Sequence, residues 1–589
     1  MTASTEESVT REPEREGASS PPDPRRWLAL SVVLFAAFMD LLDVTIVNVA
    51  VPSIQRDIGA SYSAVTWITA GYALAFATLL ITGGRLGDIF GRRRLLLTGM
   101  AGFTAASLLC GVADSPGVLI AARAVQGAAA ALMIPQVLSI IHVSFPAEER
   151  GKVFGMFSGI GGLALISGPL LGGVLVDADL FGLGWRPVFL LNIPVGIATF
   201  VAALYVVRES RDPDAPRLDI TGAVLATLSV LLLVYPLTQG RELGWPAWIF
   251  AMLVASFVVL GVFAVHQRRL VAAGRSPLIA PDLFRARSFV GGFGVNLLYS
   301  VAYGTFFMMW TLYMQNGLGW SAMRAGLTGL PMFLGLLVSA GTTVQFLVPR
   351  FGRKVLFGGG VLLMAGSLAL MLTSARYGTD IGSWQMSLPL LVLGLGMGSV
   401  LAPVLDFALN DVEHRAAGSA SGVLNTSGQL GSAVGIALVG VLFLAVLPHE
   451  SDGGVDSVQA AVRQDLAAAG VNDRQVQDAV LADHRTCSED RMGEADPTAV
   501  PASCLVPPGD VTGARGERVA GVLAEHAPQA RAETFSRAFQ VGMYGVTGLF
   551  ALMTLLMATL PRHARPQDAD TPPAVCATGG ARRGRRRTA

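Results

Sequence analysis

The chain has 589 residues, of which 52% are hydrophobic and only 14% are charged, and its formal net charge is +1. A soluble protein would carry roughly a quarter charged residues, so this composition argues against a soluble domain, and the near-neutral charge excludes bulk electrostatic attraction to nucleic acid. Repeated apolar runs, each long enough to cross a hydrocarbon core of about 30 Å as a helix, predict an all-α polytopic membrane protein.

The N-terminal segment 1–27 is polar, proline-rich and of mixed charge. It lacks the ordered charged, apolar and small-residue regions of a signal peptide, so we expect a disordered cytoplasmic tail followed by an uncleaved first span. The apolar runs that follow predict fourteen transmembrane helices. We expect them at residues 28–51, 64–83, 95–112, 118–140, 153–176, 187–207, 218–238, 247–266, 289–314, 325–346, 355–374, 385–408, 418–447 and 538–560.

Lysine and arginine are distributed unequally between the loops that join these spans. They concentrate in alternate loops, as at 92–94, whereas the short intervening loops hold isolated arginines such as Arg56. This bias predicts a protein of the cell inner (cytoplasmic) membrane with both termini in the cytoplasm. The basic tail 561–589 would then lie inside, where it fits an orientation determinant or a solvated tail better than a specific lipid-binding site.

Two carboxylates interrupt the first span, within FMDLLDVTIVNVAVP (38–52). Asp40 and Asp43 are three residues apart and therefore lie about 60° apart on one helix face. Two acids this close in a low-dielectric setting disfavour double ionisation, so a proton can be shared or exchanged between them. The alternative, an acid that only hydrogen-bonds within the bundle, fits Asp40 better than Asp43.

Arg123 is a permanent cation inside the predicted fourth span, within LIAARAVQGAAAA (119–131). Because an unpaired charge in a membrane helix is costly, we expect its side chain to face the protein interior and to find acceptors such as carbonyls, Gln126 or a carboxylate. Two roles fit this placement: Arg123 either holds helices together or modulates a nearby proton-carrying acid.

The predicted fifth span contains SGPLLGG (167–173). Gly168 and Pro169 permit a bend, because proline removes a backbone donor, and Gly172 and Gly173 permit close helix contact. Simple packing explains any one of these glycines, but the four residues together indicate a flexible seam between helices.

A short, basic, glycine-punctuated turn occurs twice, as GDIFGRRRLLLTG (87–99) and VPRFGRKVLFGGG (348–360). Each copy joins two predicted spans, which indicates repeated halves, as in many secondary transporters. The simplest plan has six spans, then two additional spans, then six more. Its parts are an N-terminal six-helix bundle at 28–207, a linker with two additional helices at 208–288 and a C-terminal six-helix bundle at 289–560.

A stripe of aromatic and polar residues follows one face of the predicted ninth span. Packing and pocket lining both explain such a stripe. Asp406, late in the twelfth span, is either a second cation or proton site or a solvated residue at the cytoplasmic end, beside Asn410 and Asp411. The stripe consists of Asn296, Tyr299, Tyr303, Phe307, Trp310 and Met314.

A long polar segment, 449–536, separates the last two predicted spans and belongs to the C-terminal bundle as a large extracytoplasmic loop. Cys487 and Cys504 both fall in it, whereas Cys110 and Cys576 do not. Disulfides persist on the oxidising side of a membrane, so we expect a disulfide between Cys487 and Cys504. The cysteine spacing shows no metal-binding pattern, and no metal site is expected.

Several motifs, in order along the chain, resemble the major facilitator superfamily, specifically its fourteen-span drug:proton antiporter branch. GRLGDIFGRRR (84–94) is similar to the family's loop between spans two and three, although Ile89 stands where a basic residue is frequent. LDVTIVNVAVP (42–52) and the fourth-span sequence around Arg123 also match. SGPLLGG resembles the fifth-span antiporter signature, and Ala164 replaces its leading glycine.

The resemblance implies a proton-coupled antiporter that exports hydrophobic or cationic small molecules by alternating access. Asp43 is the expected coupling acid, with Asp40 as an auxiliary group and Arg123 as a modulator. The expected substrate-binding residues are Asp43, Asn296, Tyr299, Tyr303, Phe307, Trp310 and Asp406. The expected conformational motifs are Gly84, Asp88, Gly91, Arg92 and Arg93, and Gly168, Pro169, Gly172 and Gly173. Among them, Asp88, Arg92 and Arg93 orient the chain, latch the outward-open state through contacts between the halves, or do both.

The expected partners are a small-molecule substrate, the proton and the lipid bilayer, without nucleic acid, and the chain is expected to act as a monomer. No cofactor is expected, because the proton gradient drives transport, and no catalytic constellation of an enzyme is present in the sequence. Two other functions remain open: a dedicated exporter of one endogenous metabolite or lipid, and a membrane sensor or receptor without flux.

Overall fold

The computed structural model describes residues 25–145, 147–211, 218–240, 243–412, 417–494, 500–505 and 508–562. Every regular element within these ranges is helical. The predicted tails lie almost entirely outside the described residues, at 1–24 and 563–589.

Helices follow one another with short connections along the whole described chain. The first group comprises α1 (Arg26–Asp57), α2 (Tyr62–Phe90), α3 (Arg92–Gly111), α4 (Pro116–Ser144), α5 (Ala147–Asp177), α6 (Pro187–Leu190) and α7 (Asn192–Val206). Two further helices are α8 (Ile220–Gln239) and α9 (Ala247–Ala272). The rest are α10 (Arg287–Leu312), α11 (Ala322–Thr328), α12 (Leu330–Thr342), α13 (Val348–Phe351), α14 (Lys354–Tyr377), α15 (Ser383–Ala408), α16 (Ala417–Val439), α17 (Leu447–Ala468), α18 (Arg474–Gly493) and α19 (Gly513–Leu556).

Thirteen helical stretches of the described chain are long and apolar enough to cross a membrane. They include all the predicted spans except the ninth, which corresponds to α10. Four glycines, Asn296 and two tyrosines make α10 less apolar than its neighbours. It nevertheless runs 26 residues and packs against α15, α16 and α19. The predicted count of fourteen is therefore consistent with the structure when α10 is included.

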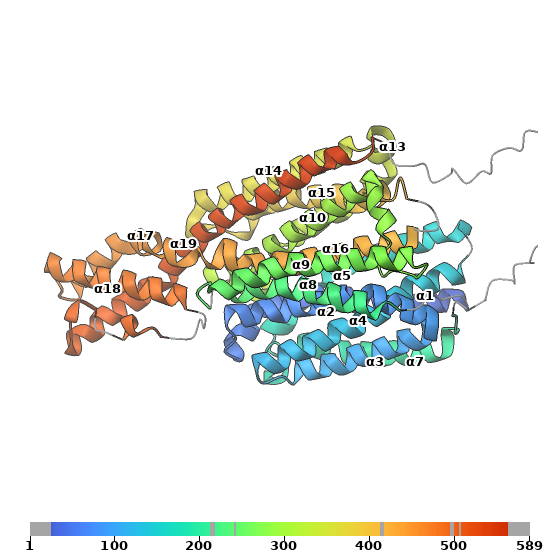
Figure 1. Ribbon diagram of the computed structural model, residues 1–589. Coiled ribbons are helices and arrows are strands. Elements are labelled where there is room, and N and C mark those ends of the chain that lie inside the picture. The colour runs from blue at the N-terminus through green and yellow to red at the C-terminus, as the bar shows by residue number, and fades with distance from the viewer. Residues whose placement is uncertain are drawn as a thin grey trace, which may run out of the picture.

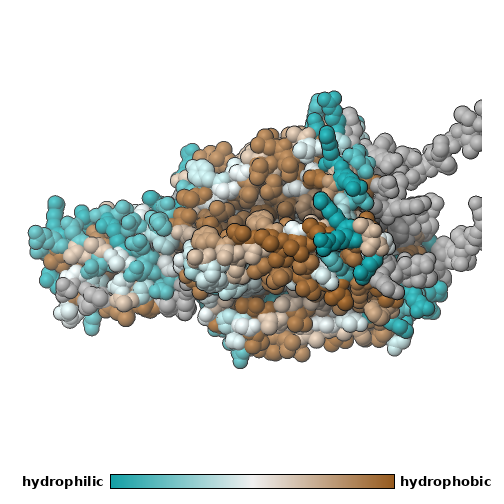
Figure 2. All heavy atoms as spheres, viewed as in Figure 1, coloured by the Kyte–Doolittle hydropathy of each residue, from teal (hydrophilic) through white to brown (hydrophobic). Residues whose placement is uncertain are grey.

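The helices form two packed groups (Figure 1). In the first, α2 and α3 pack on α4, α1 packs on α5, and α7 packs on α3. In the second, α12 and α14 pack on α15, and α10 packs on α16 and α19. Helices α8 and α9 pack on each other, and α8 also contacts α2 and α16, one helix from each group. The outer surface of α9 is strongly apolar and exposed, as at Val254 and Phe257, which suits contact with lipid (Figure 2).

Glycine ends a helix at both copies of the repeated basic turn. Gly91 follows α2 with φ +110°, and Gly352 follows α13 with φ +55°. These left-handed values are strained for any residue with a Cβ, which explains why glycine stands at the same place in both turns.

A polar helical subdomain protrudes from one end of the bundle (Figures 1 and 2). It is formed by α17, α18 and the first part of α19, which enclose a small apolar core that includes Val458, Val480 and Val519. The predicted last span is the second part of α19, a single helix of 44 residues that continues from the subdomain into the bundle. We call this end of the bundle the subdomain end.

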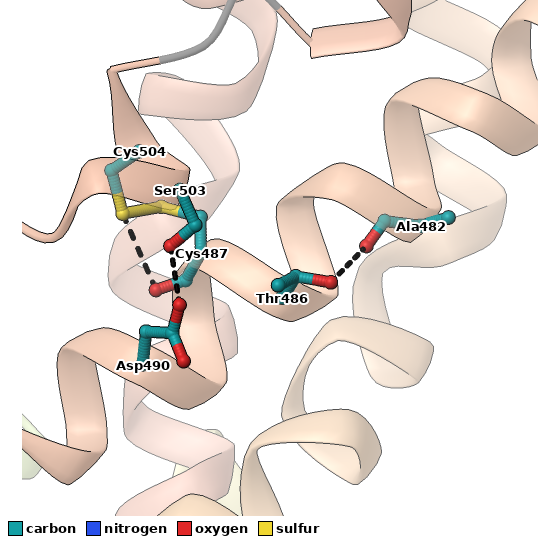
Figure 3. Close-up of a disulfide and its surroundings, with 6 residues drawn as sticks. All are labelled: Ala482, Thr486, Cys487, Asp490, Ser503 and Cys504. Atoms are coloured by element: carbon teal, nitrogen blue, oxygen red, sulfur yellow. Dashed lines mark hydrogen bonds between the residues drawn. A yellow bond between two sulfur atoms is a disulfide. The ribbon is translucent and has the colours of Figure 1, made fainter.

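A disulfide joins Cys487 of α18 to Cys504 of the short helix that follows (Figure 3). Beside it, the hydroxyl of Ser503 donates to Oδ2 of Asp490 at 2.6 Å. Both contacts connect the segment after α18 to the C-terminal turns of that helix.

The two helix groups touch closely at the subdomain end. The backbone N–H of Met323, in α11, donates to Oδ2 of Asp177 at the end of α5, at 3.1 Å. A Cβ atom added to Gly173 of α5 would lie 2.5 Å from Cα of Met323. Farther along the same contact, a Cβ on Gly326 would lie 2.5 Å from the carbonyl oxygen of Pro169. Glycine is therefore required on both sides of this seam.

We expect Gly173→Ala to open the seam, because the added methyl group meets backbone atoms of α11 that cannot move aside. Overpacking of this kind costs about 1–3 kcal/mol, which shifts a two-state equilibrium by about 5- to 150-fold. Spin labels at Leu180→Cys and Leu327→Cys, in a background without Cys110 and Cys576, would report the distance between the two sides. Gly159→Ala is the matched control, since a Cβ there meets nothing within 4 Å. Equal distance distributions in both variants would contradict this account of the seam.

We expect replacement of Cys487 and Cys504 by serine to loosen the subdomain selectively. The disulfide closes a separation of 17 residues, and a loop of roughly this length contributes about 3 kcal/mol in the chain-entropy account. Hydrogen exchange of α18 amides should accelerate, whereas exchange in α4 should not change. Added reductant should have the same effect on the wild type and none on the serine variant; unchanged exchange in α18 would show that the disulfide does not stabilise this region.

Candidate functional site

Asp43 lies at the centre of a fully buried polar network. Its Oδ2 accepts from Nη1 of Arg123 at 2.5 Å, and its Oδ1 accepts from Gln126 at 2.9 Å and from Asn192 at 2.8 Å. Ser107 accepts from the amides of both Gln126 and Asn192, at 2.8 and 3.3 Å. Asp43 is 0% exposed and Arg123 is 2% exposed. The network therefore joins α1, α3, α4 and α7.

The guanidinium of Arg123 has both hydrogen-bond acceptors and aromatic rings as neighbours. The sequence predicted acceptors for a cation in an apolar helix. Its Nη1 also donates to Gln126 at 2.6 Å, and its Nε donates to the carbonyl of Ile68 at 3.2 Å. The guanidinium lies over the ring of Tyr72 at 4.3 Å and near the ring of Phe189 at 5.7 Å. A buried charge is tolerated only when it is paired and hydrogen-bonded, and this arrangement meets both conditions.

Asp40 has a separate partner. The hydroxyl of Tyr72 donates to Oδ1 of Asp40, and both side chains are buried. Since Tyr72 also lies against Arg123, its ring connects the two acid sites. The sequence placed the acids on one helix face, whereas the structure gives each acid its own hydrogen-bond partners.

A cavity of about 110 Å³ lies between the two helix groups. Tyr72 and Arg123 line it from the first group, and Tyr303, Phe307 and Gln429 line it from α10 and α16. Asp40 and Asp43 are absent from its wall. A molecule in this cavity would touch the partners of the two acids rather than the acids themselves.

The structure divides the predicted stripe of the ninth span. Tyr303 and Phe307 line the cavity. Tyr299 stacks on Tyr303 with ring centroids 6.4 Å apart, and Trp310 packs against Phe307 at 5.9 Å, so these two residues support the lining from behind. Asn296 donates to the carbonyl of Leu424 at 2.7 Å and thereby holds α10 to α16.

Asp406 does not line the central cavity. Its side chain is exposed near the end of α15 that lies opposite the subdomain. Nearby, Asn410 donates to Asp411 at 2.9 Å. This placement matches the second of the two sequence interpretations, a solvated residue at a helix end.

The predicted loop motif makes contacts within the first helix group and also with the linker, where Arg85 donates to the carbonyl of Pro277 after α9. Arg92 donates to Asp88 at 2.9 Å, one turn back along the chain. A Cβ on Gly91 would lie 2.5 Å from Oε1 of Glu209, and this oxygen accepts from the backbone N–H of Arg93 at 3.1 Å. The latch that we expect between the halves concerns the outward-open state and stays a prediction.

Gly84 and the fifth-span motif permit close helix packing. A Cβ on Gly84 would meet Pro135 of α4 at 3.5 Å. Cβ atoms on Gly168 and Gly172 would meet α1, the first at 1.9 Å from Oγ1 of Thr45. Gly168 and Gly172 therefore allow α5 to pack closely against α1, the helix that carries Asp43. Gly173 allows α5 to pack closely against α11.

Three network residues escaped the sequence interpretation: Ser107, Asn192 and Tyr72. Ser107 and Asn192 are polar residues inside predicted spans and are 0% and 2% exposed. An isolated polar residue in an apolar span is a usable signal, because burial in a membrane protein requires a partner. The sequence could not show which of many such residues meet around one carboxylate.

Comparisons with known proteins agree with this architecture. Residues 33–436 match the family described as Major Facilitator Superfamily. The chain is 42% identical to a probable actinorhodin transporter of Streptomyces coelicolor over 94% of this chain and 95% of that protein. It is 34% identical to the tetracenomycin C resistance and export protein of Streptomyces glaucescens, over 71% of this chain and 76% of the relative.

A solved structure has the same fold. It is a bacterial homolog of the human lysosomal transporter Spinster, in an inward-facing and occupied conformation, with a TM-score of 0.55 and 14% identity. The superposition covers 92% of this chain and 97% of the other. These relatives are transporters, not enzymes. With the family match, the two helix groups and the cavity between them, the chain belongs to the Major Facilitator Superfamily of membrane transporters.

Proposed function

We propose that this transporter is a proton-coupled antiporter that exports hydrophobic small molecules across the cytoplasmic membrane. The single observation that supports coupling is the buried ion pair of Asp43 and Arg123, in which Arg123 also reaches the central cavity. Relatives that are named for export of, or resistance to, actinorhodin, tetracenomycin C and puromycin support the cargo class.

In this mechanism a proton on Asp43 competes with Arg123 for the carboxylate. Protonation of Asp43 removes the negative charge that pairs with Arg123. The guanidinium then needs other acceptors, and it can find them in the central cavity, which Arg123 lines. Cargo that contacts Arg123 and Tyr72 would then favour or oppose proton binding at Asp43 and Asp40. Linkage of this kind is reciprocal, so the proton changes the affinity for cargo by the same factor.

Alternating access explains the small size of the cavity. Drug-sized ligands occupy pockets of about 300–1,000 Å³, whereas this cavity holds about 110 Å³. The halves must therefore move apart before cargo of that size fits, and the seam between α5 and α11 is closed in the conformation described. The aromatic wall of Tyr303 and Phe307 suits flat, apolar cargo.

We place both termini and the loop motif in the cytoplasm and the subdomain on the outer side. The disulfide in the subdomain supports this orientation, because disulfides persist in oxidising compartments. The described chain ends lie at the opposite end of the bundle, where Arg353 donates to the carbonyl of Leu560 at 2.7 Å (Figure 1). The plan of six, two and six spans and a monomeric state complete the proposal.

The closest alternative is a dedicated exporter of one endogenous metabolite. The relative at 42% identity matches along nearly the whole chain, the subdomain included, and its name refers to one compound. A resistance spectrum separates the two: protection of a sensitive host against many unrelated compounds indicates a multidrug exporter, and protection against one indicates a dedicated exporter. A sensor without flux would transport none of them.

We expect Asp43→Asn to abolish gradient-driven efflux and Asp40→Asn to weaken it. Proteoliposomes with an imposed pH gradient and a panel of ethidium, puromycin and tetracenomycin C would measure this. The gradient should stimulate efflux by the wild type and not by Asp43→Asn, because an amide cannot carry the proton. Asp406→Asn is the control and should behave as the wild type, since Asp406 lies outside the cavity.

Folding needs its own control, because Asp43→Asn leaves Arg123 buried without an anion, at a cost of about 3–5 kcal/mol. Asp43→Asn combined with Arg123→Gln removes both charges and should restore thermal stability without restoring coupling. Gradient-driven efflux retained by both Asp43→Asn and Asp40→Asn would rule out these acids as the coupling site.

A further inference from the structure

A second cavity, of about 270 Å³, lies at the subdomain end, where three parts of the chain meet. Gln55 and Arg56 reach it from the end of α1, Asn316 from the segment after α10, and Arg491 and Arg531 from α18 and α19. Among the described residues that line it, none is Asp or Glu. Three arginine side chains therefore line one cavity, and none of the described residues in its wall carries a carboxylate.

The arginines of this cavity are poorly neutralised. Within the described part of the chain, Arg491 and Arg531 form no ion pair, and their charges lie close enough to repel each other. Among the described residues, Arg56 donates to Oγ of Ser53 and to the carbonyl of Pro52, both uncharged groups. All three side chains are exposed, so a solute can reach them. An anion among them would relieve the repulsion.

Gln55 supplies an independent indication of a missing acceptor. It is 2% exposed, and its Oε1 accepts from Nδ2 of Asn316 at 3.1 Å. In this arrangement Nε2 of Gln55 has no hydrogen-bond partner among the described residues. A buried donor without an acceptor is costly, so an oxygen from a bound molecule would stabilise this arrangement.

Aromatic and apolar side chains also line the cavity. They belong to Tyr62, Met492 and Phe535, beside Gln315 and Gly319. Flat, apolar surfaces of this kind bind rings, whereas inorganic phosphate or sulfate would leave them without contact. The lining therefore fits a molecule that combines an aromatic ring with a carboxylate or phenolate oxygen.

We propose that this cavity is an extracytoplasmic binding site for anionic aromatic small molecules and receives acidic cargo as it leaves the central cavity. Its place at the mouth between the halves and the subdomain suits that role, because the subdomain contributes two of the three arginines. The role in exit rests on the proposed function, whereas binding of the anion does not.

Equilibrium binding of 2-naphthoate to the purified full-length protein tests the site in non-ionic detergent, with no membrane or gradient. 2-Naphthamide, its neutral isostere, is the matched ligand. We expect 2-naphthoate to bind more tightly than the amide, and its affinity to fall as sodium chloride is raised. Arg491→Gln and Arg531→Gln should each weaken binding of the acid by about tenfold and leave binding of the amide unchanged.

Arg474→Gln, which removes an exposed arginine of α18 outside the cavity, should leave binding unchanged. Gln55→Leu should also lower the affinity for 2-naphthoate and not that for 2-naphthamide, since it removes the unpartnered Nε2 donor. Equal affinities for the acid and the amide would overturn the proposal, as would full affinity in the Arg491→Gln/Arg531→Gln double variant. Displacement of 2-naphthoate by phosphatidylglycerol in nanodiscs would instead assign the cavity to a lipid headgroup and overturn it. Because no gradient is present, loss of proton coupling would not alter these results.

Discussion

The rest of the structure depends on the need to neutralise one permanent cation inside an apolar bundle. Arg123 cannot lose its proton, so the fold must supply an anion and acceptors for its remaining donors. Asp43, Gln126 and the carbonyl of Ile68 meet that need. Because these groups come from α1, α4 and α2, and because Asn192 of α7 and Ser107 of α3 complete the shell around Asp43, one electrostatic requirement fixes the mutual positions of five helices. The glycines of α5 then bring a sixth helix against α1.

In the proposed mechanism, the same arrangement determines how cargo and proton influence each other. The acids lie behind Arg123 and Tyr72, and only these partners reach the central cavity. Cargo therefore has no direct contact with either carboxylate in the conformation described. Any influence must pass through a change in what the guanidinium and the tyrosine hydroxyl bind. Breaking a buried ion pair without a new partner for each charge costs far more free energy than exchanging one partner for another. The stability of the pair therefore depends strongly on which acceptors the guanidinium can reach.

The subdomain adds a second region of positive charge, outside the bundle. Its connection to the transport core is a continuous helix, α19, so movement of the second helix group must carry the subdomain with it. Arg491, Arg531 and Arg56 line one cavity to which both helix groups contribute. Movement of the halves would therefore change the shape of this cavity and the affinity for the proposed anion. Phe535 of α19 lies in the wall of that cavity as well.

The sequence by itself determined the membrane class, the positions of the spans and the need of Arg123 for hydrogen-bonding partners, because hydropathy and charge burial are local properties. It also indicated Asp43 through its motif. It could not determine that Ser107 and Asn192 complete the hydrogen-bond shell around Asp43, or that Tyr72 donates to Asp40. It also could not determine that Tyr303 and Phe307 are the residues of the aromatic stripe that reach the cavity. It did not show that α19 is one continuous helix, or that Glu209 accepts a hydrogen bond from the backbone of the loop motif at Arg93. Those facts depend on which helix faces meet, and only the tertiary packing of residues far apart in the chain decides that.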